Sequence, residues 1–257
     1  MKTVLLAIVL FSPLALLGQS AFDGTWRVDL HTGQISRSHQ YLLRDGVYHC
    51  ESCVPRIEVQ ADGQDHSISG SPYADTMSAK VVNDHTVDFV SKKGGKVVAT
   101  RKETVSEDGN TLTTEWKFET GGSPGSGETI STRSGPAPAG ANKISGSWKE
   151  QKDESASDSI VTFTLKSTVD GLSMSDLMGD SYTAKFDGKD YASKGDPGIT
   201  TVSLTKVDAN TIVETDKRDG KIIYVTEMKV SADGKTMAIH TEDKLHGASE
   251  KHTAKKQ

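Results

Sequence analysis

The chain has 257 residues, a formal net charge of −5 and a charged fraction of 25%, so it is long enough for two small domains. Its 30 basic and 35 acidic side chains are spread over both halves, and the sequence contains no basic patch or stripe. This distribution argues against nucleic acid or an anionic lipid surface as the main partner.

Residues 1–20 have the pattern of a secretory signal peptide. Lys2 provides a positive start, an apolar run extends from Val4 to Leu17, and small residues precede a cleavage point after Ser20. The run is too short to span a bilayer core of roughly 30 Å, so we expect no membrane insertion once the peptide is removed. The sequence therefore predicts an exported protein, either periplasmic or secreted.

The rest of the chain contains an internal duplication. Shifting the sequence by 125 residues lays residues 46–118 over residues 171–243 without a gap, with 18 identities in 73 positions. The identities fall mostly on turn residues, as where Asp62-Gly63 returns as Asp187-Gly188. A repeat of this length predicts two domains with the same fold.

Each half has the pattern of an all-β domain. Asp-Gly and Gly-Gly dipeptides recur through both halves and are a strong signal for β-hairpins. Between them apolar and polar residues alternate, and no window shows a sustained helical period. About nine short antiparallel strands per half are most stable when the sheet closes and loses its edges. We therefore expect two tandem up-and-down β-barrels over residues 21–134 and 144–257, joined by a Pro-rich linker over residues 135–143; a sandwich is the alternative.

A Gly-x-Trp sequence opens each half, with Trp26 in the first and Trp148 in the second. This resembles the opening motif of the calycin superfamily, the lipocalins and fatty-acid-binding proteins, although the second lipocalin motif is missing. The resemblance implies that each Trp plugs one end of its barrel beneath a basic residue from the last strand. Arg133 would take that part in the first half, and Lys251 or Lys255 in the second. The whole chain also resembles exported bacterial proteins of unassigned function built from Gly-x-Trp repeats.

Cys50 and Cys53 are the only cysteines. In an exported chain, a pair with this spacing around a hairpin tip predicts a structural disulfide. Redox-sensitive thiols and a metal site are the alternatives, but the sequence shows neither a helix start nor a recognised ligand spacing. The corresponding positions of the second half are Ser175 and Met178, so the fold does not require the bridge.

Strand alternation places Arg101 and Glu103 on the inner face of the first barrel, where the second half carries uncharged residues. The repeat alignment predicts that His49 points inward as well. Buried charges are costly unless they are paired or meet a ligand or water. These residues therefore predict a polar ligand pocket lined by His49, Arg101, Glu103 and Trp116. The alternatives are a register error of one residue and a barrel end that is open to solvent.

The second barrel is expected to have an apolar inner face with Glu214 as its lone acid. The predicted inner residues are Phe163, Leu172, Met174, Tyr182, Phe186, Leu204, Ile212, Tyr224, Met228 and Ile239. This face predicts either a pocket for a lipid-like molecule, with Glu214, Tyr224 and Met228 among its contacts, or a packed core. A narrow barrel can be filled by its own side chains.

The sequence shows no catalytic constellation, because nucleophile-elbow, zinc-protease and phosphate-loop motifs are missing. The two Asp-Gly-x-Asp turns, at residues 62–65 and 187–190, offer too few oxygen ligands for calcium by themselves, so turn stabilisation is the favoured role. We therefore expect a non-enzymatic binding protein for a small, apolar ligand, with no cofactor and no metal. The alternative is an envelope or surface module whose solid barrels contact another protein.

Overall fold

The computed structural model describes residues 20–119 and 122–257. Within these residues α1 (Asp158–Val161) is the single helix, and no helix has the length and apolar character needed to cross a membrane. The expected signal peptide lies outside the described residues, apart from Ser20 at its predicted cleavage point.

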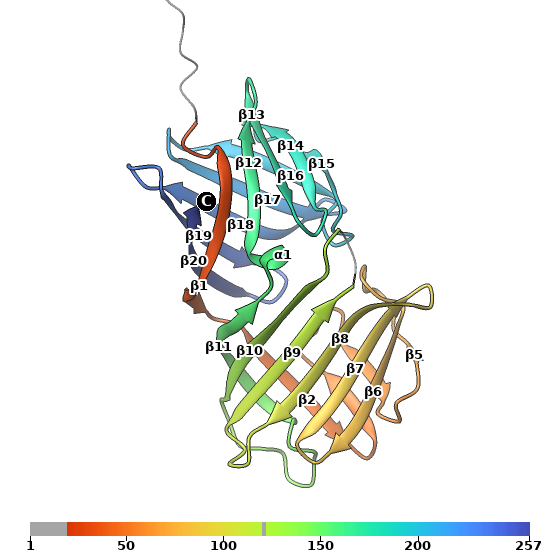
Figure 1. The fold of residues 1–257 in the computed structure, drawn as a ribbon. Helices are drawn as coiled ribbons and strands as arrows, with labels where there is room; N and C mark the ends of the chain where they lie inside the picture. The colour runs from red at the N-terminus through yellow and green to blue at the C-terminus, as the bar shows by residue number, and fades with distance from the viewer. Residues whose placement is uncertain (1–19, 120–121) are drawn as a thin grey trace, which may run out of the picture.

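The described chain forms two ten-stranded antiparallel sheets (Figure 1). The nearly closed sheet, here called the first barrel, contains in spatial order β4 (Ile57–Gln60), β3 (Val47–Cys50), β2 (Ser38–Arg44), β11 (Gly146–Ala156), β10 (Gly125–Arg133), β9 (Thr111–Phe118), β8 (Lys96–Val105), β7 (Thr86–Lys93), β6 (Thr76–Asn83) and β5 (His66–Ser67). The closed sheet, here called the second barrel, contains β1 (Gly24–Ile35), β12 (Thr162–Ser167), β13 (Gly171–Asp176), β14 (Ser181–Lys185), β15 (Tyr191–Lys194), β16 (Thr201–Lys206), β17 (Thr211–Arg218), β18 (Lys221–Val230), β19 (Thr236–Asp243) and β20 (Ala248–Lys256). The prediction of two antiparallel β-barrels is confirmed, with ten strands in each rather than about nine.

The two Gly-x-Trp strands are exchanged between the halves of the chain. β1 is the first strand in the sequence, but it pairs with β12 and β20 of the second barrel, where Trp26 lies opposite Phe163. β11 begins the second half but pairs with β10 and β2 of the first barrel, where Trp148 lies opposite Arg133. In Figure 1 the red β1 accordingly lies among the green and blue strands of the second barrel. Each barrel is therefore completed by a strand from the other half.

The exchange gives the connecting segments different roles from those expected. Residues 135–143, the expected interdomain linker, join β10 to β11 within the first barrel. The chain passes between the barrels after β1, at residues 36–37, and again through residues 157–161, which include α1. Hydrophobic alternation predicts which face of a strand is buried, but not which of two similar barrels the strand completes.

The expected barrel ranges change for the same reason. The first barrel is contiguous in sequence but covers residues 38–156 rather than 21–134. The second barrel combines β1 with residues 162–256, so the range 144–257 describes it only in part.

Several tight turns adopt the conformation that their dipeptides predict. Asp45 and Gly46 have φ values of 51° and 75° and connect paired residues of β2 and β3. Asp219 and Gly220 have φ values of 52° and 80° and connect β17 to β18 in the same way. Positive φ at both central residues characterises the turn whose twist matches that of the flanking strands, and it favours Asp-Gly.

Each barrel has its own hydrophobic core with a buried Trp. Trp26 and Trp148 are both fully buried. The indole Nε1 of Trp26 donates a hydrogen bond to the carbonyl of Phe22 at 2.8 Å, and that of Trp148 donates to the carbonyl of Ile144 at 2.8 Å. A buried indole N–H left without an acceptor is costly, so both repeats use the same local device.

The basic residue that covers each Trp ring is not the one expected from the sequence. The guanidinium carbon of Arg133 lies 4.0 Å from the ring centre of Trp148 rather than over Trp26. Trp26 is covered instead by Lys256, whose Nζ lies 5.0 Å from the ring centre, and not by the two lysines expected for a second-half Trp. The strand exchange is the reason, because it brings each Trp beneath the last strand of the other half.

Candidate functional site

The first barrel holds a buried ion pair on its inner face. Glu103 is fully buried, and its Oε1 lies 3.3 Å from Nε of Arg101. Nη2 of Arg101 donates a hydrogen bond to Oη of Tyr48 at 3.1 Å, and the guanidinium stacks 4.3 Å from the ring centre of Phe89. The structure thus brings Arg101 and Glu103 together inside the barrel, on the face where alternation predicts them.

The positive charge of Arg101 is balanced by side chains of the first barrel itself. Burial raises the pKa of the Glu103 carboxyl and of the Tyr48 hydroxyl, and the positive charge of Arg101 opposes both shifts. A carboxylate without a partner at this depth would be strongly unfavourable. Arg101 and Glu103 therefore form a neutral pair rather than a free receptor for an anion.

A cavity of about 540 Å³ lies beside this pair, at the end of the first barrel next to the second barrel. Its apolar wall consists of Tyr41, Ile57, Met77, Phe89, Ala99, Trp116 and Phe118. The rings of Trp116 and Phe118 lie 5.3 Å apart, and Phe118 remains 39% exposed. The cavity therefore presents accessible aromatic surface.

The position of Trp116 in this wall is set by neighbouring strands. Its Nε1 donates a hydrogen bond to Oγ1 of Thr129 at 3.1 Å, and that hydroxyl donates to Oδ1 of Asp153 at 2.7 Å. The chain of hydrogen bonds links β9, β10 and β11. Arg101 and Trp116 are thus the two predicted pocket residues that line the cavity, and Glu103 lies fully buried beside Arg101.

The rim of the cavity is charged and draws on both barrels. Nη2 of Arg37, between β1 and β2, lies 3.3 Å from Oδ2 of the buried Asp243 on β19. Nε2 of His39 lies 3.2 Å from Oε2 of Glu150, which is also buried. The contact of Arg37 with Asp243 crosses the junction between the barrels, whereas that of His39 with Glu150 lies within the first barrel.

Two further carboxyl groups at the rim differ from these. Asp153 and Glu250 line the cavity, and neither lies within ion-pair distance of a basic side chain in the described part of the chain. Burial raises the pKa of both carboxyls; repulsion from Glu150 adds to each shift, and Arg37 and His252 oppose it. Their negative charge is therefore only partly compensated.

The exchanged strand is essential to this arrangement. Glu150 and Asp153 belong to β11, which comes from the second repeat, and Glu250 belongs to β20 of the second barrel. The apolar wall of the cavity and Arg101 come from the first repeat. Figure 1 shows β11 completing the first barrel beside β10 near its junction with the second barrel. The cavity is therefore built from both halves of the chain.

His49 does not reach the cavity, so its predicted inward orientation is wrong. Its Nδ1 lies 3.5 Å from Oε2 of Glu58, an exposed residue on β4. The neighbouring Tyr48 and Cys50 are the buried residues of β3 and belong to the core of the first barrel.

The cause is a one-residue offset between the repeats at this hairpin. Tyr41 pairs with Cys50 in the first barrel, whereas Leu165 pairs with Met174 in the second. The two hairpins therefore correspond at a shift of 124 residues rather than 125. The ungapped repeat alignment therefore does not preserve the side-chain direction across this hairpin. A shift of one residue moves a side chain to the opposite face of a sheet.

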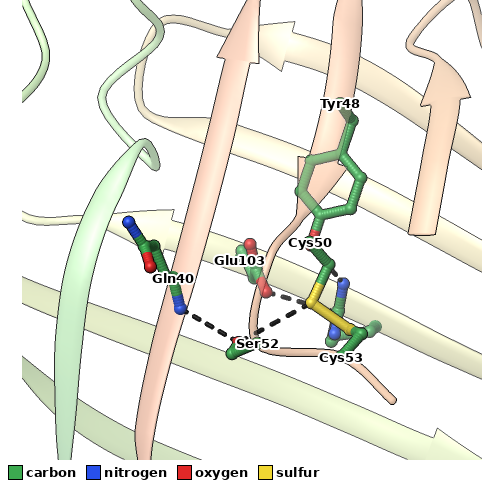
Figure 2. The surroundings of a disulfide bond; sticks show 7 residues. Gln40, Tyr48, Cys50, Ser52, Cys53 and Glu103 are labelled. Atoms are coloured by element: carbon green, nitrogen blue, oxygen red, sulfur yellow. Dashed lines mark hydrogen bonds and ion pairs between the residues drawn. A yellow bond between two sulfur atoms is a disulfide. The ribbon is translucent and has the colours of Figure 1, made fainter. Parts of the chain in front are cut away.

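The predicted disulfide is confirmed. Cys50 and Cys53 are bonded, with their Cα atoms 5.4 Å apart. Figure 2 shows the bridge among its surrounding side chains, where Oγ of Ser52 accepts a hydrogen bond from the backbone N–H of Gln40 at 3.0 Å. Cys50 also pairs across the sheet with Tyr41, one of the cavity residues. The bridge therefore fixes the end of β3 beside the cavity wall.

The second barrel holds a polar cluster at one end instead of a lone acid. Tyr182 donates a hydrogen bond to Glu214, and Asp216 lies next along the inner face. Burial raises the pKa of both acids, and with repulsion from Glu214 it raises the pKa of Asp216 to about 9. Tyr224 lies opposite Asp216, whereas Met228 is buried in the core. The three residues predicted as ligand contacts therefore do not form one site.

The rest of the predicted apolar face in the second barrel is packed. Leu172, Tyr182, Leu204 and Ile212 are buried in its core, and Phe163, Met174, Phe186 and Ile239 pack against them. Together with Trp26, these side chains form one packed hydrophobic core. The packed-core alternative describes this part of the barrel.

The two Asp-Gly-x-Asp turns make the same contacts in both repeats. The first Asp of each turn accepts a hydrogen bond from the backbone N–H two residues later, and the second Asp pairs with a Lys. The distances are 2.9 Å for Asp62 and Gln64, 3.0 Å for Asp187 and Lys189, 2.6 Å for Asp65 and Lys92, and 2.5 Å for Asp190 and Lys217. Residues 20–119 and 122–257 contain no cluster of three or more His, Cys, Asp or Glu side chains arranged to hold a metal ion.

Sequence reasoning missed part of the site. Tyr48 follows from strand alternation once the tight turn at residues 45–46 is recognised. The groups at the rim carry no such signal, because Arg37, Asp153 and Glu250 meet only through the exchange of strands.

No family model, curated protein or solved structure matches this chain. A proposal about its function therefore rests on the chemistry of the cavity and on the sequence.

Proposed function

We propose that this protein is an exported, non-enzymatic binding protein that holds a small molecule in the cavity of the first barrel. The observation that carries the proposal is the cavity of about 540 Å³ with an aromatic wall. Small-molecule sites in proteins usually have volumes of roughly 300–1,000 Å³ and combine apolar walls with a few polar groups. The cavity has both properties.

The ligand of this proposal has a mainly apolar body. Trp116 and Phe118 offer ring faces, and Met77 and Ile57 extend the same wall. Apolar surface removed from water contributes about 25 cal/mol per Å², so this wall favours an aromatic or aliphatic skeleton. The resemblance of the Gly-x-Trp barrels to lipocalins agrees with this reading, but a shared fold does not by itself assign a ligand.

The two barrels have separate tasks in this proposal. The second barrel supplies Glu250 to the rim and accepts β1, while its own packed core makes it a support. The alternative function, contact with another macromolecule through a solid barrel, suits that packed core and does not use the cavity.

Native mass spectrometry of the protein purified without refolding tests the proposal, since a bound molecule adds a discrete mass. Trp116 provides a second readout. It lines the cavity, whereas Trp26 and Trp148 are fully buried elsewhere. A ligand should shift the Trp emission and protect it from acrylamide, and Trp116→Phe should abolish that response.

The matched control is Trp116→Phe in the absence of ligand, which should retain the circular dichroism spectrum of the unchanged protein. A cavity that takes up neither co-purified molecules nor aromatic and aliphatic probes, with Trp116 equally open to acrylamide throughout, would contradict the proposal.

A further inference from the structure

The charged groups around the cavity can be sorted by their partners. Most of them are already paired: Arg101 with Glu103, Arg37 with Asp243, and His39 with Glu150. Asp153 accepts a hydrogen bond from Thr129. Within the described residues neither Asp153 nor Glu250 has a basic side chain at ion-pair distance, although Arg37 and His252 offset part of their charge. The charge left over at the rim is therefore negative.

The surroundings of these two carboxyls make that charge unfavourable in the empty protein. Both groups lie in a partly buried rim and repel each other as well as Glu150. A positive group placed between carboxylates recovers part of the solvation that burial removes. A cation is therefore the ligand charge that the rim favours.

The aromatic wall indicates what kind of cation fits. Trp116 and Phe118 line the same cavity as the two carboxyls. Ring faces attract an ammonium group through cation–π interactions and also hold an apolar skeleton. A bare metal ion would leave this wall unused, and no metal-binding cluster occurs in residues 20–119 and 122–257.

An anionic ligand is disfavoured by the same geometry. Arg101 is the basic residue deepest in the cavity region, but Glu103 neutralises it and Tyr48 accepts one of its hydrogen bonds. A carboxylate ligand would have to compete with Glu103 and pass Asp153 and Glu250 at the rim.

We propose that the cavity binds an organic cation: a primary or secondary amine with an aromatic or aliphatic body. The ammonium group is held by Asp153 and Glu250, and the body packs against Trp116 and Phe118. This inference rests on the proposed function, because it specifies the ligand class of the same cavity.

Isothermal titration calorimetry with matched compounds tests the inference on the full-length protein. One series consists of 1-naphthylmethylamine, 1-naphthylmethanol and 1-naphthoate, and a second of octylamine, octanol and octanoate. Within each series the skeleton is nearly constant and the charge changes. We expect the amine to bind more tightly than the alcohol by about tenfold, the size of one or two charge-assisted hydrogen bonds, and the carboxylate to bind most weakly.

Variants then locate the ammonium group. Asp153→Asn and Glu250→Gln should each weaken amine binding by roughly tenfold and leave alcohol binding unchanged. Glu154→Gln is the matched control, because Glu154 is the neighbour of Asp153 on β11, pairs with Lys152 and is 48% exposed. This substitution also removes one negative charge, and it should not change the affinity for the amine. Circular dichroism confirms that each variant is folded.

The outcomes separate this inference from the function on which it rests. If alcohol or carboxylate binds as tightly as the amine, the cavity binds ligands but the inference is overturned. The same conclusion follows if Glu154→Gln weakens the amine as much as Asp153→Asn does. If no compound of either series binds, the inference fails, and native mass spectrometry with the Trp116 readout then decides whether the proposed function fails with it.

Discussion

The second barrel has a packed apolar core with a polar cluster around Glu214, whereas the first barrel has a cavity beside its core, although both derive from one repeated pattern. They share a fully buried Trp, Asp-Gly turns and the same Asp–Lys pair after the Asp-Gly-x-Asp turn. They differ at several inner positions, two of which carry a buried ion pair in the first barrel only. Arg101 and Glu103 of the first barrel correspond to Thr226 and Met228 of the second.

These two positions show how one backbone supports a hollow and a filled interior. Met228 packs in the core of the second barrel, and Thr226 makes a hydroxyl contact of 3.1 Å with Thr241. At the same places the first barrel has an ion pair, which keeps a polar boundary beside the cavity. The features common to both repeats maintain the backbone, whereas the inner face differs between them.

The largest effect should come from dividing the chain by repeat instead of by barrel. A fragment of residues 38–156 contains every strand of the first barrel, whereas residues 21–134 lack β11 and carry β1 in its place. Loss of a buried Trp alone costs about 3–5 kcal/mol, and domains are stable by only about 5–15 kcal/mol. We expect a cooperative thermal transition by circular dichroism for 38–156 and a much weaker one for 21–134. Equal stability of the two would show that β1 can replace β11.

The second effect tests the exchange residue by residue. Trp26→Ala should destabilise the second barrel and Trp148→Ala the first, by about 3–5 kcal/mol each. Hydrogen exchange measured by mass spectrometry should show the loss over β16–β19 for the first variant and over β6–β9 for the second. The Phe variants serve as controls and should show smaller losses at the same places. Loss of protection in the half of the chain that carries each mutation would argue against the exchange.

The third effect concerns the inner face that separates the two barrels. Arg101→Thr introduces the residue of the second barrel but leaves Glu103 buried without a partner, which should cost about 3–5 kcal/mol. Adding Glu103→Met removes that charge and should recover most of the stability. Urea unfolding measures both variants. A double variant no more stable than Arg101→Thr alone would mean that the ion pair is not what distinguishes the two interiors.

The fourth effect is a pH dependence of the second barrel. The pKa of Asp216 is raised to about 9 from 3.8, so the folded state holds a proton that the unfolded chain releases. Its contribution to stability is therefore complete below about pH 4 and is lost as the pH rises toward about 9. Asp216→Asn should flatten the fall in melting temperature across this window. Asp233→Asn, at an exposed turn, is the control, and an unchanged slope in Asp216→Asn would refute the assignment.

The smallest effect should come from the disulfide, which only the first barrel has. The bridge closes a loop with a sequence separation of 3, so the chain-entropy model allows at most about 2 kcal/mol. Cys50→Ala combined with Cys53→Ala should lower the stability of the first barrel by that amount or less in urea unfolding. Hydrogen exchange in β12–β20 should not change. A larger loss, or one that spreads to the second barrel, would give the bridge a wider structural role.

Some residues of the candidate site can be placed from their local sequence, whereas others are brought together only by long-range contacts. The inward position of Arg101, Glu103 and Trp116 follows from strand alternation, which depends only on neighbouring residues. The outward direction of His49 depends on the register of its hairpin, and the ungapped repeat alignment is off by one residue there. Asp153 and Glu250 are almost a hundred residues apart and meet only because β11 joins the first barrel.

The sequence by itself determined the all-β class, the hairpin turns, the disulfide and the inner position of the buried ion pair. Each of these follows from local requirements: alternation along a strand, positive φ at turn residues, and the short reach between Cys50 and Cys53. Only the tertiary structure decided which barrel each Gly-x-Trp strand completes, which basic residue covers each Trp, and which side chains of the two barrels meet around the cavity. Both barrels offer such a strand the same kind of pairing edge, so the choice depends on packing and connections across the whole chain.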